Sequence, residues 1–224
     1  MMARNKKAKE LYVKLNYEIP SNRLLIKLDG VSFSYIRRLN SDIKNIIYKQ
    51  VFIETALRAI EKLSYIYFIF IRDDEFYCFI RKIDIPSLSP TKLMSQICSY
   101  FSVVFNRYLD EMSLHNAEKI QLFDTKIIPI DQTSDLLKAI DQDLRMDIGN
   151  SIKMKCNLND MDFPKVVKYE DLFQIASNYE IDLYNEFWYS FGMLISRKGT
   201  KVIEADHKKH WENISCMYEK YIKD

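Results

Sequence analysis

The segment RLLIKLDGVSFS, residues 23–34, is a run of apolar residues that ends abruptly in Asp29-Gly30. Near-continuous apolarity from Arg23 to Leu28 predicts a β-strand that is buried on both faces and therefore central in its sheet. Such a strand delivers the Asp29 carboxylate to its own C-terminal end, where a glycine can turn the chain. The predicted function depends on whether a second carboxylate lies near Asp29.

A second acidic segment supplies the candidate partner. Two β-rich runs, residues 66–71 and 76–80, are separated by Arg72-Asp73-Asp74-Glu75. This pattern is typical of a hairpin with acidic residues at its tip. We therefore expect Asp74 and Glu75 to lie at one end of a sheet.

The order of the predicted elements places that tip beside Asp29. A long helical pattern opens at Ser41-Asp42, and another has Ser89-Pro90 as its N-cap and first residue. A further strand is expected over residues 121–130, QLFDTKIIPI. Strand, helix, hairpin, helix, strand is the ferredoxin-like βαββαβ order, in which the first strand neighbours the hairpin. The fold class is therefore α+β, with Asp29 near Asp74.

Three regions follow from this order. Residues 1–22 carry several basic side chains and are expected to be an N-terminal arm or a short helix, and residues 23–132 are expected to form the core. Residues 133–224 are expected to be an extension packed on the core, with helices at 133–154, 169–178 and 206–223. Two strands joined around Arg197-Lys198-Gly199-Thr200 are expected within residues 187–204.

Composition limits the protein class. The chain has 224 residues, is 48% hydrophobic and has a net charge of +2, which fits a globular protein without a strong overall field for polyanions. No apolar run is long enough to span a bilayer, so no membrane partner is expected. The 4 cysteines lack CxxC spacing. We expect them to be reduced, in a cytoplasmic protein.

Two carboxylates that converge from strand ends suit a site for two Mg²⁺ ions. Mg²⁺ prefers carboxylate oxygens and keeps waters for substrate phosphates. Asp29 and Asp74 would be the ligands, with the Gly30 carbonyl as a neutral third oxygen. Strand alternation predicts that the adjacent Glu75 points to the other face. The alternative to a metal site is that Asp29-Gly30 is a simple turn and that residues 72–75 are a solvated hairpin tip.

Five short segments, in order, resemble the tRNA-histidine guanylyltransferase superfamily, the 3′-to-5′ nucleotide-adding enzymes, over roughly residues 23–204. The segments are LLIKLDGVSFSYI (24–36), DDEFYCF (73–79), SPTKLMSQICSYFSVVFN (89–106), FDTKIIPI (123–130) and RKGTKVI (197–203). The resemblance implies a palm domain like that of polymerases and nucleotide cyclases. It also implies a nucleotidyltransferase that uses two Mg²⁺ ions and GTP or ATP on the 5′ end of a tRNA or other RNA, in a homotetramer.

The resemblance also implies roles for individual residues. Asp29, Asp74 and Glu75 match catalytic positions, and Asp29, Gly30 and Asp74 match metal ligands. The nucleotide would be bound by Gly30, Val31, Ser32, Phe33, Ser34, Asp73 and Lys92, with Lys92 on the triphosphate. RNA or phosphate would be bound by Lys126, Asn150, Arg197 and Lys198.

The chain departs from the guanylyltransferase pattern at several positions. Val31 and Ser34 replace a basic residue and a histidine, and Asp73 replaces a serine. Residues 143–152, DLRMDIGNSI, lack the histidine of that region, and Asn150-Ser151-Ile152 is closer to the Thg-like branch. That branch is associated with templated repair of truncated tRNA 5′ ends. Two alternatives stay open: a palm-fold nucleotide cyclase or oligonucleotide signal synthase, and a non-catalytic nucleotide- or RNA-binding palm.

Overall fold

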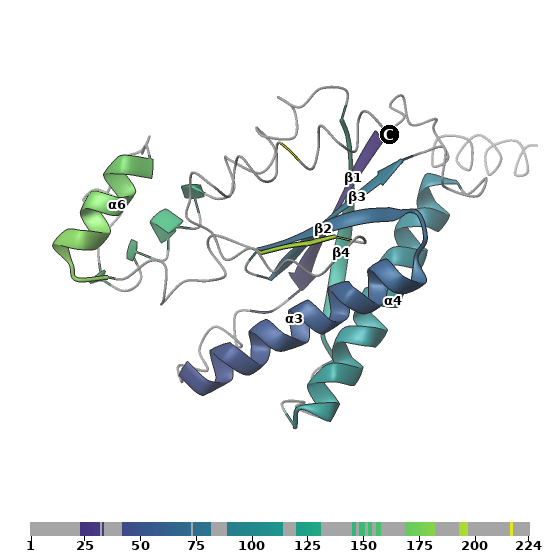
Figure 1. Cartoon of the computed structure of the whole chain (residues 1–224), viewed down its shortest axis with the longest axis horizontal. Helices are drawn as coiled ribbons and strands as arrows, with labels where there is room; N and C mark the ends of the chain where they lie inside the picture. Colours follow the sequence, from purple (N-terminus) through teal and green to yellow (C-terminus); the bar gives the residue numbers. More distant parts are fainter. Residues whose placement is uncertain are drawn as a thin grey trace, which may run out of the picture.

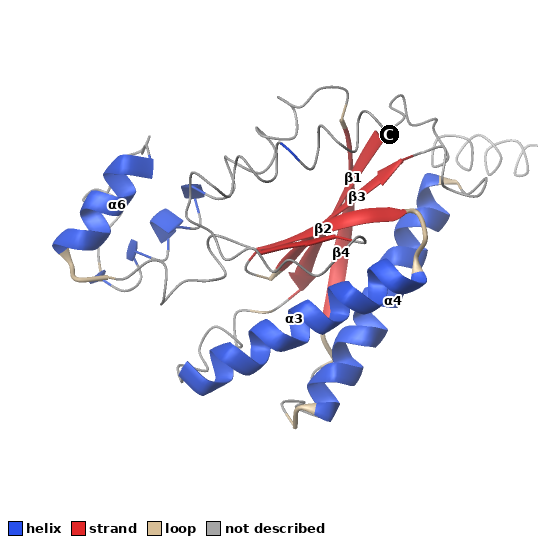
Figure 2. Ribbon diagram, viewed as in Figure 1, coloured by secondary structure: helices blue, strands red, loops and turns tan. Residues whose placement is uncertain are grey.

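The computed structural model describes residues 23–31, 33, 42–72, 74–81, 89–113, 120–130, 145–146, 148–150, 152–153, 156–157, 169–181, 193–196 and 216. Figure 2 shows a mixed α+β fold, with long helices beside one sheet. The main elements are, in chain order, β1 (Arg23–Val31), α3 (Asp42–Lys62), β2 (Ile66–Arg72), β3 (Glu75–Arg81), α4 (Pro90–Glu111), β4 (Leu122–Pro129), α6 (Tyr169–Asn178) and β5 (Met193–Ser196).

The five strands form one antiparallel sheet in the order β4-β1-β3-β2-β5. The first four strands and the two long helices have the predicted βαββαβ order, and β1 does pair with the hairpin strand β3. Strand β5 extends the sheet beyond β2. Helices α3 and α4 lie together against one face of the sheet (Figure 1).

Strand β1 is longer than the apolar run that predicted it. It continues through Asp29-Gly30 to Val31, so Gly30 is still paired within the sheet and does not begin a turn. Its central position is confirmed, because β3 and β4 flank it. Leu24, Ile26 and Leu28 belong to the core beneath the helices. Lys27 and Asp29 lie on the opposite face because side chains alternate along a strand.

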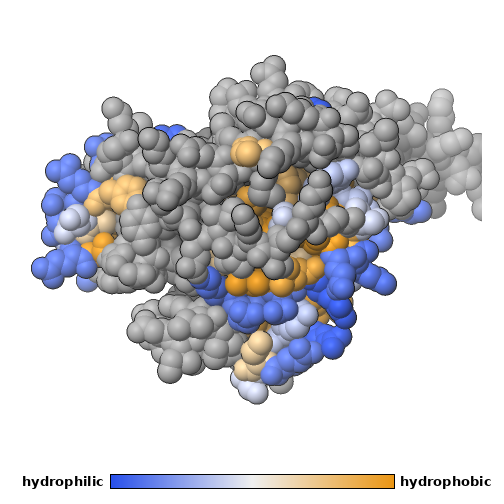
Figure 3. Space-filling model, viewed as in Figure 1, coloured by the Kyte–Doolittle hydropathy of each residue, from blue (hydrophilic) through white to orange (hydrophobic). Residues whose placement is uncertain are grey.

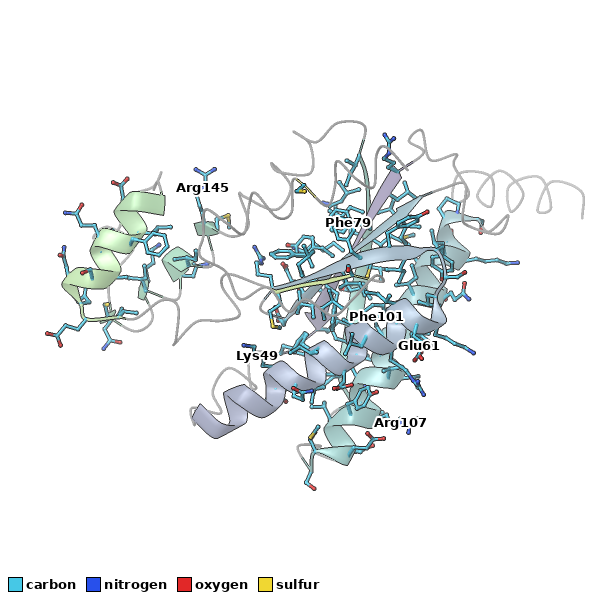
Figure 4. All side chains as sticks on the ribbon, in the orientation of Figure 1. Lys49, Glu61, Phe79, Phe101, Arg107 and Arg145 are labelled. Carbon is cyan, nitrogen blue, oxygen red and sulfur yellow. The ribbon has the colours of Figure 1, made fainter. Side chains whose placement is uncertain are left out.

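The two helices begin where the sequence predicts and cover that core. Ser89 is the N-cap of α4, with its hydroxyl accepting a hydrogen bond from the Lys92 amide at 3.4 Å, and Pro90 is the first helical residue. The buried stripe of α4 includes Leu93, Ile97, Phe101, Val104 and Phe105. Figure 4 shows Phe101 between the helix and the sheet, with Arg107 further along the same helix, near its end.

An aromatic cluster fills the space between the helices and the end of the sheet that carries Asp29. Phe33 has its ring centroid 6.2 Å from that of Phe52, 5.4 Å from that of Phe105 and 5.3 Å from that of Phe123. Phe76 is 4.8 Å from Phe101 in an edge-on arrangement. Each buried Phe side chain contributes about 1.5–3 kcal/mol from apolar burial. The end of β1 that carries Asp29 therefore lies over a well-packed aromatic core.

The region after residue 132 is described in part. Helix α6 spans the predicted residues 169–178 and lies apart from the sheet in Figure 1. Its visible surface, like that of α4, is largely hydrophilic (Figure 3). The arm at 1–22, the helix at 206–223 apart from Cys216, and most of 133–154 lie outside the described residues. The three-region division therefore stays a prediction. Within the described part, no helix is long and apolar enough to cross a bilayer.

Candidate active site

Asp29 and the hairpin tip meet at one end of the sheet, as the topology predicts. Asp29 is directly opposite Glu75 on β3 and opposite Asp124 on β4. The backbone amide of Gly30 donates a hydrogen bond to the carbonyl of Asp74, with N and O 3.1 Å apart. One backbone contact therefore joins the two segments that carry the predicted carboxylates.

The two carboxylates differ in their surroundings. The Asp29 residue is exposed and Asp74 is half-buried. Burial of part of the Asp29 carboxyl is the largest cause that raises its pKa, and the negative charge of Glu75 raises it further. The positive charges of Lys27 and Arg72 act in the opposite direction. The negative charge of Asp124 raises this pKa slightly as well, so Asp29 lies in a field set by four neighbouring side chains on its own face of the sheet.

Glu75 lies on the same face as Asp29. The sequence predicts the other face by alternation from Asp74, but Asp74 lies in the turn, and alternation begins only when β3 starts at Glu75. Glu75 is 7% exposed. Its carboxylate accepts hydrogen bonds from Arg72 and Tyr77 and forms an ion pair with Lys27. The side chain is therefore buried among cationic and phenolic donors.

The donors at this end of the sheet fit a hard cation. Two carboxylates and a backbone carbonyl offer oxygen ligands only, and this leaves coordination positions for the waters and phosphate oxygens that Mg²⁺ retains. Across the described residues, no group of three or more His, Cys, Asp or Glu side chains is placed to hold a metal ion. The two segments that carry the predicted ligands are adjacent, and the ligand set of Asp29, Asp74 and the Gly30 carbonyl stays a prediction.

Phe33, one of the predicted nucleotide-binding residues, is packed in the hydrophobic core. It is 2% exposed and belongs to the aromatic cluster beneath the sheet. Val31 is 39% exposed at the end of β1, opposite Leu122. Lys92 is exposed in the first turn of α4, and the described contacts do not join it to Asp29 or Asp74.

The predicted RNA- or phosphate-binding residues are placed in part. Lys126 is exposed on β4, directly opposite Lys27, and alternation puts it on the face that carries Asp29. Asn150 is exposed in a short helical segment, residues 148–150. The other predicted site residues lie outside the described part of the chain: Ser32, Ser34, Asp73, Arg197 and Lys198.

The sequence prediction missed three charged neighbours of the site. Lys27, Arg72 and Asp124 lie on the Asp29 face, as the strand register shows. The available signal was a charged side chain inside an otherwise apolar strand, as at Lys27 in LLIKLDG. A buried charge is costly unless it is paired, so such a residue predicts a partner on an adjacent strand.

Comparisons with known proteins point to one fold. No protein-family model and no curated protein sequence matches the chain. A bacterial tRNA(His) guanylyltransferase (Thg1)-like protein in complex with ATP is similar in structure, with a TM-score of 0.69, 15% identity, and coverage of 95% of this chain and 98% of that chain. The same kind of protein in complex with GTP gives a TM-score of 0.63 at 13% identity, covering 96% and 98% of the two chains.

A eukaryotic protein has a similar fold. The tRNA(His) guanylyltransferase of Saccharomyces cerevisiae has a TM-score of 0.62 at 16% identity, over 87% of this chain and 94% of that chain. At sequence identities this low, the similarity is evidence of a shared fold only. The chain therefore has the fold of the Thg1-like proteins and of tRNA(His) guanylyltransferase, which confirms the fold that the sequence resemblance implies.

Proposed function

We propose that this chain is a metal-dependent nucleotidyltransferase that adds nucleotides in the 3′-to-5′ direction to the 5′ end of a tRNA or a similar RNA. The observation that carries the proposal is the meeting of Asp29 with the Asp74 segment through the Gly30 amide. The fold supports it, because it extends over nearly all of both chains in comparisons with proteins whose complexes contain ATP or GTP.

The residues of the site have distinct tasks in this proposal. Asp29, Asp74 and the Gly30 carbonyl would hold two Mg²⁺ ions, which when bound lower the pKa of an attacking hydroxyl and neutralise charge on phosphate oxygens. Lys126, exposed on the same face, would bind phosphate oxygens of the RNA end or of the nucleotide.

The reaction forms one bond and breaks another. The 3′-hydroxyl oxygen of the incoming nucleotide attacks the phosphorus of an activated 5′ end, and the bond from that phosphorus to its leaving phosphate group breaks. The hydroxyl proton passes to solvent or to a phosphate oxygen. An RNA with a 5′-monophosphate first requires activation by ATP or GTP, whereas a 5′-triphosphate end already carries the leaving group.

The test supplies labelled nucleoside triphosphates and 5′-truncated tRNAs to the full chain with Mg²⁺. We expect labelled tRNA from the wild type and at least a roughly 100-fold loss of product with Asp29→Asn or Asp74→Asn. Asp110→Asn is the matched control, because Asp110 is an exposed aspartate on α4 outside the site. Folding of each variant is checked by circular dichroism.

Three outcomes would contradict the proposal. If either site variant keeps full activity, the metal-ligand assignment is wrong. A cyclic or short oligonucleotide product formed from nucleoside triphosphates alone, without RNA, would instead support the nucleotide cyclase or oligonucleotide synthase alternative. Nucleotide binding that is unaffected by EDTA, with no product on any RNA, would support a non-catalytic palm.

A further inference from the structure

Four side chains from three strands form a buried polar cluster beside the candidate site, which we call the Glu75 cluster: Lys27, Arg72, Glu75 and Tyr77. The side chains of Arg72 and Glu75 are 2% and 9% exposed, and that of Lys27 is 17% exposed. Tyr77 is fully buried, and its ring lies 5.5 Å from Lys27 Nζ and 5.7 Å from Arg72 Cζ. Each buried charge in such a cluster is costly unless it is paired, so the pairing of these side chains determines whether the cluster stabilises the site.

Both carboxylate oxygens of Glu75 are occupied by partners within the protein. Oε1 is in an ion pair with Lys27 Nζ. Oε2 accepts hydrogen bonds from Arg72 Nη2 and from the Tyr77 hydroxyl. A carboxylate held in this way has little capacity left for a metal ion. Glu75 therefore differs from the exposed Asp29 and the half-buried Asp74.

The contacts of Glu75 cross the strands at the level of the site. Arg72 and Glu75 are directly opposite each other in the hairpin, so Asp73 and Asp74 are the two residues between them. Glu75 is also directly opposite Asp29 on β1, and Lys27 lies two residues before Asp29. One carboxylate thus ties the base of the hairpin turn to the end of β1.

The charges of the Glu75 cluster are balanced only when the neighbouring Asp29 is counted with them. Lys27 and Arg72 bring two positive charges, and Glu75 brings one negative charge. The charges of all three act on Asp29, as does that of Asp124 on the other side of β1, and Asp29 supplies the second negative charge beside the cluster. Removing Glu75 alone would leave the cluster with two cations and no anion of its own, whereas removing Lys27 and Glu75 together would leave one cation, Arg72, beside Asp29.

We propose that Glu75 is a positioning residue whose carboxylate, held by Lys27, Arg72 and Tyr77, fixes the hairpin tip against β1 and so sets the spacing of Asp29 and Asp74. Glu75 itself binds neither metal nor substrate. The role rests on the proposed function, because Asp29 and Asp74 are the ligands that it positions. It replaces the catalytic role that the sequence resemblance implies for Glu75.

The experiment compares a single and a charge-balanced double variant of the full chain. Glu75→Gln keeps the shape and removes the charge, and Lys27→Met with Glu75→Gln removes the ion pair. The matched control is the exposed pair Arg107–Glu111, with N and O 2.8 Å apart and side chains 69% and 46% exposed, changed as Glu111→Gln and as Arg107→Met with Glu111→Gln. Three quantities are measured: Tm by circular dichroism, Mn²⁺ binding by electron paramagnetic resonance, and nucleotidyl transfer.

We expect Glu75→Gln to lower Tm by roughly 6–20 °C, because breaking a buried ion pair leaves cations uncompensated. Loss of a residue that orients metal ligands should weaken Mn²⁺ binding roughly 10-fold. The double variant should recover at least half of the lost Tm and bind Mn²⁺ within about threefold of the wild type, because its charges are balanced. Both control variants should shift Tm by less than about 2 °C, since exposed pairs contribute little.

Two results would overturn the proposal. If Glu75→Gln leaves Tm unchanged but abolishes Mn²⁺ binding, and the double variant restores nothing, Glu75 is a metal ligand. If Glu75→Gln changes neither Tm nor Mn²⁺ binding, the cluster positions nothing. The Tm and Mn²⁺ measurements need no RNA substrate. A wild type that binds Mn²⁺ but transfers no nucleotide would therefore contradict the proposed function while the role of Glu75 is still decided.

Discussion

Gly30 lies against the ring of Phe33, and a Cβ atom at position 30 would stand 2.5 Å from Phe33 Cδ2. Carbon atoms in proteins do not approach so closely, so a side chain at position 30 requires the ring to move. The ring is 2% exposed and is packed against Phe52, Phe105 and Phe123. Glycine at this position is therefore a packing requirement of the aromatic cluster.

The contact predicts a specific pair of variants. Gly30→Ala should destabilise the protein by about 1–3 kcal/mol, because overpacking forces the ring or the backbone to shift. Adding Phe33→Leu, which removes part of the ring, should make the effect of Gly30→Ala smaller than in the wild-type background. Urea unfolding monitored by tryptophan fluorescence and circular dichroism measures both free energies.

Val31→Ala is the control, since Val31 is the next residue in β1 and is 39% exposed. It should change the free energy of unfolding by less than about 0.5 kcal/mol. If Gly30→Ala costs the same in both backgrounds, the Phe33 ring is not what excludes a side chain at Gly30.

Tyr65 predicts a loss of stability at high pH. Its hydroxyl is buried without a hydrogen-bond partner among the described residues. Burial, with a smaller contribution from Cys78, raises the pKa of Tyr65 from 10.0 to about 12. The folded state therefore holds this proton more tightly than the unfolded state, so the stabilisation is complete below pH 10 and is lost as the pH rises through about 12. The loss should be roughly 2 kcal/mol.

Tyr65→Phe isolates this contribution. The variant should be as stable as the wild type at pH 8, or more stable by about 1 kcal/mol, because it removes a buried hydroxyl that lacks a partner. It should also lose less stability than the wild type between pH 10 and 12. Urea unfolding at pH 8, 10 and 11 gives the comparison. Parallel pH curves for the two proteins would show that the Tyr65 hydroxyl is not the responsible group.

Metal binding should stabilise the wild type and leave the ligand variants unchanged. At a Mg²⁺ concentration ten times the dissociation constant, the gain is about 1.4 kcal/mol, or roughly 3–5 °C in Tm. Asp29→Asn and Asp74→Asn should show little rise, whereas Asp110→Asn should follow the wild type. EDTA should reverse the shift. An equal rise in Asp29→Asn would mean that the ion binds elsewhere.

Lys126 should contribute to RNA binding through phosphate. Lys126→Ala should weaken binding of RNA of any sequence, and the slope of log affinity against log salt concentration should fall by about 1. Lys62→Ala is a suitable control, because Lys62 is exposed at the end of α3. Fluorescence anisotropy with labelled tRNA at several salt concentrations measures both slopes. An unchanged slope in Lys126→Ala would remove Lys126 from the RNA-binding surface.

The periodicity of the sequence determined most of the local structure. Helix α4 begins at Pro90 after the predicted Ser89 cap, and α6 has the predicted bounds, because capping residues and apolar stripes act within a few turns of chain. The approach of Asp29 to Asp74 also follows from sequence, because the order of strands and helices permits few topologies.

Only the tertiary structure decided the environment of those residues. Whether Glu75 faces Asp29 depends on where β3 begins and on its register with β1, and a shift of one residue reverses every side chain. The burial of Glu75 depends on Lys27 and Arg72 from two other strands. Likewise, Gly30 is required by the ring of Phe33 within a cluster drawn from both helices and the sheet. The sequence by itself specifies which residues carry charge or lack a side chain, but register and packing across strands decide which atoms those residues meet.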